Sequence, residues 1–370
     1  MSSVSLTGVS LAYPGGHLGL ADIDLTVLDG EFVALVGPSG SGKTTLLRTV
    51  AGFVRPTAGS VSIGSTIVAN PQRAVEPERR GLGMVFQQHA VWPHWSVGRN
   101  IEYPLKRAGV AKPERQRRVT EALELVGLSG YAQRNPATLS GGQRQRVAIA
   151  RAVVAHPRVL LLDEALSALD EPLRDRLRLE LRELTRELGL TVLHVTHDRA
   201  EALAIADRIV VLDGGRVLQI GTPAELLADP ATSFVASFLA DATVLAGFTT
   251  GEGFVAHESG MTVPAAALRV PGDGAPIGVG PAEVAILPDA VHAVPDPDGA
   301  GLVVSSLFGR DGDDLLVDWN GVRIRSRVPG ARCAAGTRVR LEVQKALVYS
   351  SADTQSSSPS LPAERTTVDA

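Results

Sequence analysis

Cysteine is almost absent from this chain, and so are long uninterrupted apolar runs. The one cysteine, Cys333, excludes an internal disulfide and is typical of a protein from a reducing compartment. No segment reaches the roughly 18 consecutive apolar residues of a membrane-spanning helix, and the N-terminus lacks the basic and apolar regions of a signal peptide. We therefore expect a soluble chain.

Positive charge is limited too. The formal net charge of -4 gives no overall basic field, so we expect no nucleic-acid partner. Lysine occurs only at Lys43, Lys106, Lys112 and Lys345, while arginines are numerous. A lysine inside a glycine-rich stretch, as at Lys43, therefore indicates a specific function.

The order of apolar segments predicts an α/β fold followed by a β domain. The 370 residues, 44% of them hydrophobic, suffice for two or three domains with real cores. Across residues 1–235, buried-strand patterns alternate with helical ones, which is typical of a parallel sheet, and residues 88–152 predict a helical insertion. Residues 236–350 predict short strands, and residues 351–370, rich in Ser, Thr and Pro, are expected to be disordered.

The stretch GPSGSGKT follows an apolar strand pattern and precedes a helical one, which is the context that a phosphate-binding loop requires. Its backbone N–H groups and helix N-terminus would hold the β- and γ-phosphates, with Lys43 as a point charge and the Thr44 hydroxyl on Mg²⁺. The predicted nucleotide-binding residues are Gly37, Pro38, Ser39, Gly40, Ser41, Gly42, Lys43, Thr44 and Thr45. The sequence thus predicts a protein that binds a nucleoside triphosphate.

Two acidic residues stand at the end of the apolar run VLLLD. Asp163 could hold Mg²⁺, while Glu164 could orient or deprotonate an attacking water. The next predicted strand ends before His197, which could hydrogen-bond a γ-phosphate oxygen. We interpret His194, within that strand, as a packed histidine.

The segment LSGGQ places two glycines at a predicted helix start. It can be interpreted as a capped surface helix, with Ser140 as the N-cap. It can also be a second anion site, because unobstructed N–H groups and the helix dipole favour phosphate. Since one phosphate loop is already present, this second site would serve the nucleotide of another molecule through Ser140, Gly141, Gly142 and Gln143.

Taken together, these motifs resemble those of the ATP-binding-cassette family. The resemblance covers about residues 4–235: GPSGSGKT as Walker A, LSGGQ as signature, VLLLDE as Walker B, SALD as D-loop and VTHD as the switch-histidine segment. It implies a P-loop cassette with a RecA-like parallel sheet and a helical subdomain. It also implies ATP and Mg²⁺ as cofactors, ATPase activity, and two copies closing head to tail over two ATP molecules.

Three further positions take roles from this resemblance alone. Tyr13 matches the aromatic residue that stacks on adenine, although without the resemblance it would be interpreted as a packed strand tyrosine. Gln87 matches the glutamine that reaches Mg²⁺ and the attacking water. Asp170 matches the D-loop aspartate at the dimer seam. Ala165 departs from the pattern, since importer relatives usually have proline after the catalytic glutamate; we expect only a modest effect on loop entropy.

The region after Gln87 resembles the part of importer ATPases that docks on a permease. Trp92, Pro93, His94 and Trp95 are expected to be exposed there as an interface, although buried core aromatics are the alternative. The implied protein is a homodimeric subunit that lies peripherally on the cytoplasmic face of the cell membrane. It would act with transmembrane permease subunits and, indirectly, with a solute-binding protein.

The C-terminal β region resembles the OB-like, oligomer-binding-type (TOBE) domain of such importers. Its stretch Pro281-Ala282-Glu283 lacks the arginine usual there, which weakens any inference about the solute. The linker FVASFLADATVLAG is most similar to the ferric-iron type, so ferric iron ranks first, with polyamine, sulfate, quaternary amine or sugar as alternatives.

Two other functions remain open at this point. One is a non-transport cassette ATPase acting on nucleic acid or ribosomes, although such proteins usually have two cassettes or a long inserted coiled coil. The other makes the β domain a ligand sensor that inhibits the ATPase.

Overall fold

The computed structural model describes residues 3–88, 90–166, 171–272, 277–309, 312–327, 330 and 332–350. These residues divide into two compact units, Met1–Pro223 and Ala224–Ala370. The sequence places the boundary at residue 235, whereas the structure groups residues 224–235 with the second unit. The predicted D-loop, including Asp170, and the tail 351–370 lie outside the described residues.

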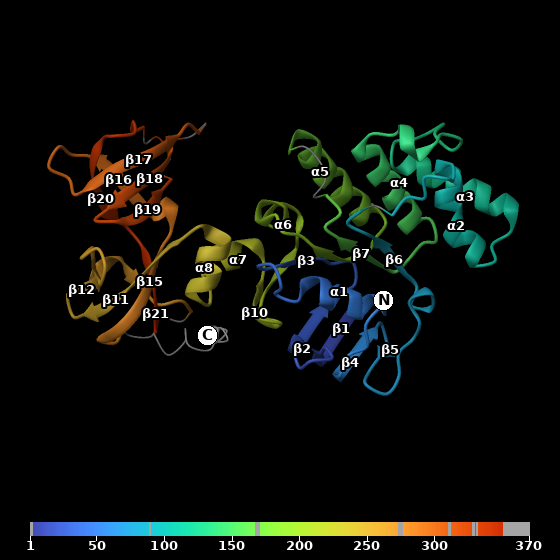
Figure 1. The fold of residues 1–370 in the computed structure, drawn as a ribbon, viewed down its shortest axis with the longest axis horizontal. Coiled ribbons are helices and arrows are strands. Elements are labelled where there is room, and N and C mark those ends of the chain that lie inside the picture. The colour runs from blue at the N-terminus through green and yellow to red at the C-terminus, as the bar shows by residue number, and fades with distance from the viewer. Residues whose placement is uncertain are drawn as a thin grey trace, which may run out of the picture. The chain divides into compact units, whose positions relative to one another are not determined.

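The first unit contains two sheets with a helix between them (Figure 1). An antiparallel sheet in the order β2-β1-β4-β5 lies below helix α1 (Lys43–Ala51) in Figure 1. A six-stranded sheet in the order β10-β9-β3-β8-β7-β6 contains the parallel strands. The first sheet comprises β1 (Val4–Ala12), β2 (Leu18–Val27), β4 (Ala58–Ile63) and β5 (Thr66–Ala69). The second comprises β3 (Phe32–Val36), β6 (Leu82–Val85), β7 (Val159–Asp163), β8 (Thr191–Val195), β9 (Arg208–Asp213) and β10 (Arg216–Gly221).

The central strands are apolar because helices or a second sheet cover both of their faces. One core joins α1 to both sheets through Leu46, Leu47 and Val50. The other core lies between the six-stranded sheet and the remaining helices. These helices are α2 (Val97–Arg107), α3 (Lys112–Leu125), α4 (Gly141–Val153), α5 (Glu171–Glu187) and α6 (Arg199–Ile205).

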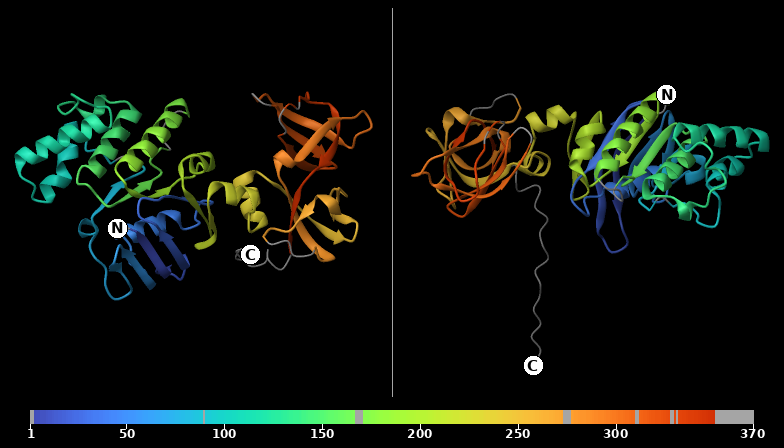
Figure 2. Two further views of the ribbon diagram at one scale, coloured as in Figure 1. Left: turned by 180° about the vertical axis from the view of Figure 1, so that it is seen from behind. Right: turned by 90° about the horizontal axis from the view of Figure 1, so that it is seen from above.

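The helical insertion predicted for residues 88–152 corresponds to α2, α3 and α4. Between β6 and β7 the described residues contain helices and turns but no strand. Both views in Figure 2 show the blue-green helices of this insertion at one end of the first unit. In α2 the buried side chains Val97, Ile101 and Leu105 repeat at the helical period, which gives the segment its packed face.

The second unit is built mainly of strands, as the sequence predicted. After α7 (Pro223–Ala228) and α8 (Ser233–Ala240), two sheets form, in the orders β13-β12-β11-β15-β21-β14 and β16-β20-β17-β18-β19. Side chains from both sheets share one core. The first sheet comprises β11 (Thr243–Thr250), β12 (Gly253–Ala256), β13 (Thr262–Pro264), β14 (Leu268–Arg269), β15 (Gly280–Ile286) and β21 (Ala346–Ser350). The second comprises β16 (Val291–Pro295), β17 (Gly301–Leu307), β18 (Asp314–Trp319), β19 (Val322–Ser326) and β20 (Arg338–Val343).

Candidate nucleotide-binding and hydrolysis site

The candidate site lies where four parallel strands of the first unit end. Strands β3, β8, β7 and β6 are neighbours in the sheet and run in the same direction. Their carboxyl ends therefore share one edge, which is where ligands bind in open α/β sheets. The phosphate loop follows β3, Glu164 follows β7, His197 follows β8 and Gln87 follows β6.

The loop between β3 and α1 has a backbone that only glycine accommodates easily. Gly37 has φ 153°, and a Cβ on it would lie 2.1 Å from the carbonyl oxygen of Leu212. Gly42 has φ 99°, and its Cβ would lie 2.7 Å from the carbonyl oxygen of Gly19. Gly42 is also the N-cap of α1, and no side chain of the described residues caps that helix. The first N–H groups of α1 therefore remain available as donors.

Lys43 is buried inside this loop. Its Nζ donates to the carbonyl oxygens of Gly37 and Pro38, both at 2.8 Å, and to Ser41 Oγ at 3.3 Å. Burial lowers the pKa of the ammonium, and the nearby Glu164 carboxylate partly opposes that shift. The scarce lysine thus lies at the centre of the glycine loop. Ser39 and Gly40 are exposed at the loop surface, and Thr44 and Thr45 are half-buried in the first turn of α1.

Side chains from the two neighbouring strand ends contact Glu164. Gln87 Nε2 donates to its Oε2 at 2.6 Å, and His197 Nε2 contacts its Oε1. Its backbone has φ 48°, which is unusual for a residue with a side chain, and its N–H donates to the carbonyl of Val195 at 2.9 Å. The structure therefore brings together Gln87, Glu164 and His197, which the sequence had connected only through roles in a motif.

Asp163 is buried next to Glu164 at the end of β7. Its pKa is raised, chiefly by burial, with the charge of Glu164 adding to the shift and that of Arg48 opposing it. A divalent cation near this carboxylate would favour its ionised form. His194 is fully buried and hydrogen-bonded to Glu201, so its interpretation as a packed histidine agrees with its position.

Tyr13 lies just beyond the end of β1 and is 39% exposed. Its hydroxyl is 3.1 Å from Thr45 Oγ1 on α1, so the ring stands beside the phosphate loop rather than within a strand core. The ring also stacks on His17, with centroids 6.4 Å apart. The position leaves an aromatic face next to the loop that would hold the phosphates.

The signature segment forms a capped helix start. Ser140 Oγ accepts from the N–H of Gln143 at 3.3 Å, and Gln143 Oε1 accepts from the N–H of Ser140 at 3.0 Å. The capping interpretation is therefore correct in part, because Ser140 is the N-cap. The N–H groups of Gly141 and Gly142 precede the first intrahelical bond and stay available as donors. The second anion site at this helix end remains a prediction.

The sequence predicted that the tryptophans after the Gln87 segment are exposed at an interface. In the structure these tryptophans are not fully exposed. Trp92 and Trp95 are half-buried, because their rings pack on each other, with centroids 4.7 Å apart, and on Tyr103, whereas Pro93 and His94 are exposed. Buried Asn100 exchanges hydrogen bonds with the backbone of Trp92, at 2.8 and 3.0 Å. The aromatic cluster is therefore a fixed platform rather than a set of loose side chains.

The sequence analysis did not identify the residues that fix the segment carrying His197. Asp198 caps α6 by accepting from the N–H of Glu201 at 3.1 Å, and Arg178 of α5 donates to Asp198. The spacing Asp-x-x-Glu at a helix start was the available signal.

Among the described residues, no group of three or more His, Cys, Asp or Glu side chains could hold a metal alone. Likewise, no helix in the described part of the chain is long and apolar enough to cross a membrane.

Fold and site together define a P-loop nucleotide-binding cassette, and comparisons with known proteins agree. A family model described as ABC transporter matches residues 20–167. The chain is 46% identical, over 76% of its own length and 75% of the relative's, to the sn-glycerol-3-phosphate import ATP-binding protein UgpC of Chromohalobacter salexigens. It is 41% identical to UgpC 2 of Agrobacterium fabrum, over 92% of this chain and 96% of that protein.

Solved structures give the same result. The ATP-binding cassette MJ0796, in a dimeric post-hydrolysis state bound to ADP and Pi, is 35% identical with a TM-score of 0.53, and covers 60% of this chain and 98% of that one. CbiO1 from Clostridium perfringens is 28% identical with a TM-score of 0.57, over 63% of this chain and 94% of that one. The chain belongs to the ABC transporter family, as an ATPase of the importer type.

Proposed function

We propose that this protein hydrolyses ATP, as half of a head-to-tail dimer, to drive uptake of a sugar-phosphate solute through a partner permease. The observation that carries the catalytic part is the convergence of Gln87, Glu164 and His197 beside Lys43. A base, a group that can orient water and a hydrogen-bonding imidazole ring would then face the place where a γ-phosphate would lie.

In this proposal each residue has a distinct role. Lys43 and the first N–H groups of α1 bind the β- and γ-phosphates, which requires Lys43 to exchange contacts with loop carbonyls for contacts with phosphate. Glu164 takes a proton from the attacking water, Gln87 positions that water, and His197 contacts the γ-phosphate. Tyr13 stacks on adenine.

The donors present fit Mg²⁺ shared with a nucleotide. Asp163 carboxylate, Thr44 hydroxyl and Gln87 amide are hard oxygen ligands, and they are too few to bind the ion without phosphate oxygens. When bound, Mg²⁺ would neutralise phosphate charge during hydrolysis. It would also lower the pKa that burial raises at Asp163.

The second half of the site comes from another copy in this proposal. The N–H groups of Gly141 and Gly142, at the start of α4, would contact the γ-phosphate bound by the partner's loop, with Ser140 and Gln143 fixing that helix end. Asp170 would lie at the seam. The relative MJ0796 is described as dimeric, which supports this arrangement.

A permease would dock on the aromatic cluster of the helical insertion. Beside it, a groove of about 830 Å³ is lined by Trp95, Tyr103, Arg99 and Lys106, among others. Arg99 lies over the ring of Trp95 at 4.7 Å, so the surface offers aromatic area together with positive charge, as interface hot spots do. With its permease, the chain would lie peripherally on the cytoplasmic face of the membrane, and a solute-binding protein would deliver the solute.

For the solute, the relatives favour a sugar phosphate over ferric iron. The two UgpC proteins, at 46% and 41% identity to this chain, are named for sn-glycerol-3-phosphate import. The linker similarity that ranked ferric iron first is a shorter and weaker signal. The names also disfavour a non-transport ATPase acting on nucleic acid. We further infer that the second unit is the oligomer-binding-type domain of such importers.

Two measurements test the proposal. Glu164→Gln should retain ATP binding, lower kcat by about a thousandfold and accumulate an ATP-bound dimer, because the base is lost while the phosphate loop remains. Hydrolysis at the wild-type rate would remove Glu164 from its proposed role. For transport, the chain co-expressed with its permease should support uptake of labelled glycerol-3-phosphate in membrane vesicles, and uptake of ferric iron or sulfate instead would overturn the solute assignment.

A further inference from the structure

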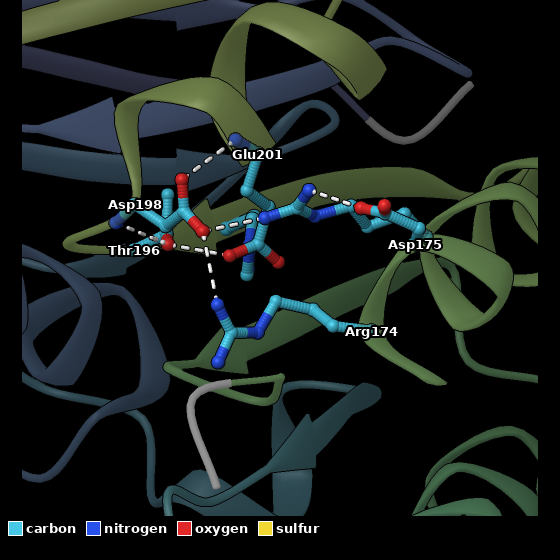
Figure 3. Close-up of polar contacts among 7 residues, drawn as sticks. Arg174, Asp175, Thr196, Asp198 and Glu201 are labelled. Atoms are coloured by element: carbon cyan, nitrogen blue, oxygen red, sulfur yellow. Dashed lines mark hydrogen bonds and ion pairs between the residues drawn. The ribbon is translucent and has the colours of Figure 1, made fainter. Parts of the chain in front are cut away.

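A polar network connects Asp198, the residue after His197, to helix α5 (Figure 3). Asp198 follows His197 directly, and its Oδ2 accepts from Arg178 Nη2 at 2.5 Å and from Arg174 Nη1 at 3.4 Å. Figure 3 shows Arg174 extending from α5 toward Asp198. The two arginines are one turn apart on α5, so they approach Asp198 from the same helix face.

The other side of Asp198 is held by buried groups. Its Oδ1 accepts from the N–H of Glu201 at 3.1 Å, and its own N–H donates to Thr196 Oγ1 at 3.0 Å. Thr196 Oγ1 in turn donates to Glu201 Oε2 at 2.7 Å, and Glu201 Oε1 is 3.0 Å from His194 Nε2. The segment on both sides of His197 is thus fixed by hydrogen bonds, whereas the His197 side chain itself is half exposed.

The charge state of this network agrees with its geometry. Burial would raise the pKa of Glu201, but hydrogen bonds from His194 and Thr196 and the charge of Arg178 outweigh it, so that the pKa is lowered. Glu201 therefore stays ionised inside the protein, as a buried acceptor of two hydrogen bonds. A buried and paired network of this kind holds its members in one arrangement.

From this geometry we infer that Asp198 is a positioning residue for His197, fixed by Arg178 and Arg174 of α5. The inference rests on the proposed role of His197 at the γ-phosphate. The Asp198 carboxylate bonds to the two arginines and to the helix N–H, and in this way it sets the backbone from which His197 reaches Glu164 Oε1. Misplacing a catalytic group by about 1 Å can cost a hundredfold in rate, so a salt link to α5 can control hydrolysis without contacting nucleotide.

A second salt link from the same helix provides a matched control. Arg182, one turn after Arg178, pairs with Asp207 beyond the other end of α6, and Asp207 Oδ2 also accepts from the N–H of Phe32 at 2.9 Å. Asp207 is 40% exposed and Asp198 is 31% exposed. Both aspartates thus join α5 to the sheet side of the unit, and only Asp198 adjoins His197.

The test compares Asp198→Asn with Asp207→Asn in the full-length protein. Asparagine still accepts from the N–H of Glu201 as an N-cap, so Asp198→Asn removes the ionic partner of Arg178 and keeps the cap. We expect Asp198→Asn to lower kcat by about ten- to a hundredfold with the KM for ATP changed less than about twofold. Asp207→Asn should lower the melting temperature by about as much as Asp198→Asn does, and it should leave kcat within about twofold of the wild-type value.

Arg178 gives a second, independent variant. Arg178→Gln should reproduce the loss of kcat, and Arg178→Lys should restore much of it, because the charge at Asp198 returns. Arg178 also pairs with Asp175, whose side chain is 62% exposed. Asp175→Asn removes the charge of that partner and should leave kcat unchanged. Equal kcat in Arg178→Gln and wild type would overturn the inference.

A double-mutant cycle separates this inference from the proposed function. In a His197→Ala background, Asp198→Asn should cause no further loss of kcat, since it acts through the side chain already removed. Independent, multiplying losses would overturn the positioning role while leaving His197 in place. If His197→Ala itself hydrolysed ATP normally, both the role of His197 and the inference would fail.

Discussion

Two helices of the first unit begin with glycine-rich segments, and they begin differently. Helix α1 starts after Gly42, whose φ of 99° suits glycine, and no described side chain caps it. Helix α4 starts after Ser140, which forms a reciprocal capping box with Gln143. One helix end leaves its backbone donors to a ligand, and the other satisfies part of them internally before a ligand arrives.

Glycine is also present in the two segments for different reasons. In the phosphate loop the chain itself excludes a side chain, since a Cβ on Gly37 would overlap the carbonyl oxygen of Leu212. Gly141 and Gly142 lie inside α4, where any L-residue adopts the backbone and most would form a better helix. Backbone conformation therefore accounts for the glycines of the first segment, since Gly37, Gly40 and Gly42 all have positive φ, but it does not account for Gly141 or Gly142. In the proposed dimer, glycine at residue 141 would leave room for the partner's nucleotide.

The largest effect should come from Gly37→Ala. A Cβ 2.1 Å from the carbonyl oxygen of Leu212, at φ 153°, forces the loop and β9 apart. We expect the free energy of unfolding to fall by about 3 kcal/mol and nucleotide binding to be lost. Urea unfolding and binding of a fluorescent ATP analogue would measure both.

Gly40→Ala is the matched control for this prediction. Gly40 has φ 82° in the same loop, and a Cβ there would meet no atom within 4 Å. Only backbone strain remains, so we expect a loss of about 1 kcal/mol. If the two variants lost equal stability, the close approach to Leu212 would not be the reason for glycine at residue 37.

The sequence predicted the parts of this molecule that depend on local patterns. The apolar runs of β3, β7 and β8 identified the sheet, and the glycine loop with Lys43 predicted a phosphate site between a strand and a helix, because each pattern depends on its own neighbours along the chain. The two-sheet arrangement of the second unit could not be predicted, since strand pairing over long separations leaves little local trace.

Contacts between distant segments account for the rest of what was missed. The half-burial of Trp92 depends on Tyr103 and on Asn100, which the aromatic composition alone does not reveal. The pairing of Arg178 with Asp198 joins residues 20 positions apart, and the arginines of α5 look like an ordinary solvated face in sequence. The motif identifies His197 but not the residues that fix the position of its backbone.

The second prediction tests whether the partner's nucleotide approaches the glycine at residue 141. Gly141→Ala should keep or raise stability, by up to about 1 kcal/mol, because alanine favours helix. Gly141→Asp should also fold, since an acidic residue in the first helical turn is compatible with the dipole. The aspartate would nevertheless repel a γ-phosphate approaching from the partner, so we expect ATP binding to persist and hydrolysis to fall by at least about a hundredfold.

Stability and activity should therefore move apart at residue 141, whereas they fall together at residue 37. Thermal unfolding, ATP binding and phosphate release on the same preparations would show the difference. Unimpaired hydrolysis by Gly141→Asp would contradict a role of this helix end at the partner's nucleotide.

The smallest effect should follow from opening the capping box. Ser140→Ala removes the acceptor for the N–H of Gln143, and we expect it to cost about 1 kcal/mol of the free energy of unfolding. Hydrolysis should fall only a few fold, because the N–H groups of Gly141 and Gly142 and the dipole of α4 remain. Ser140→Asn keeps an N-cap acceptor and should restore stability. If it restores stability without restoring hydrolysis, the Ser140 hydroxyl contacts the partner's nucleotide in addition to capping; if both return, the hydroxyl acts through the cap alone, and the backbone donors of the two glycines carry the interaction.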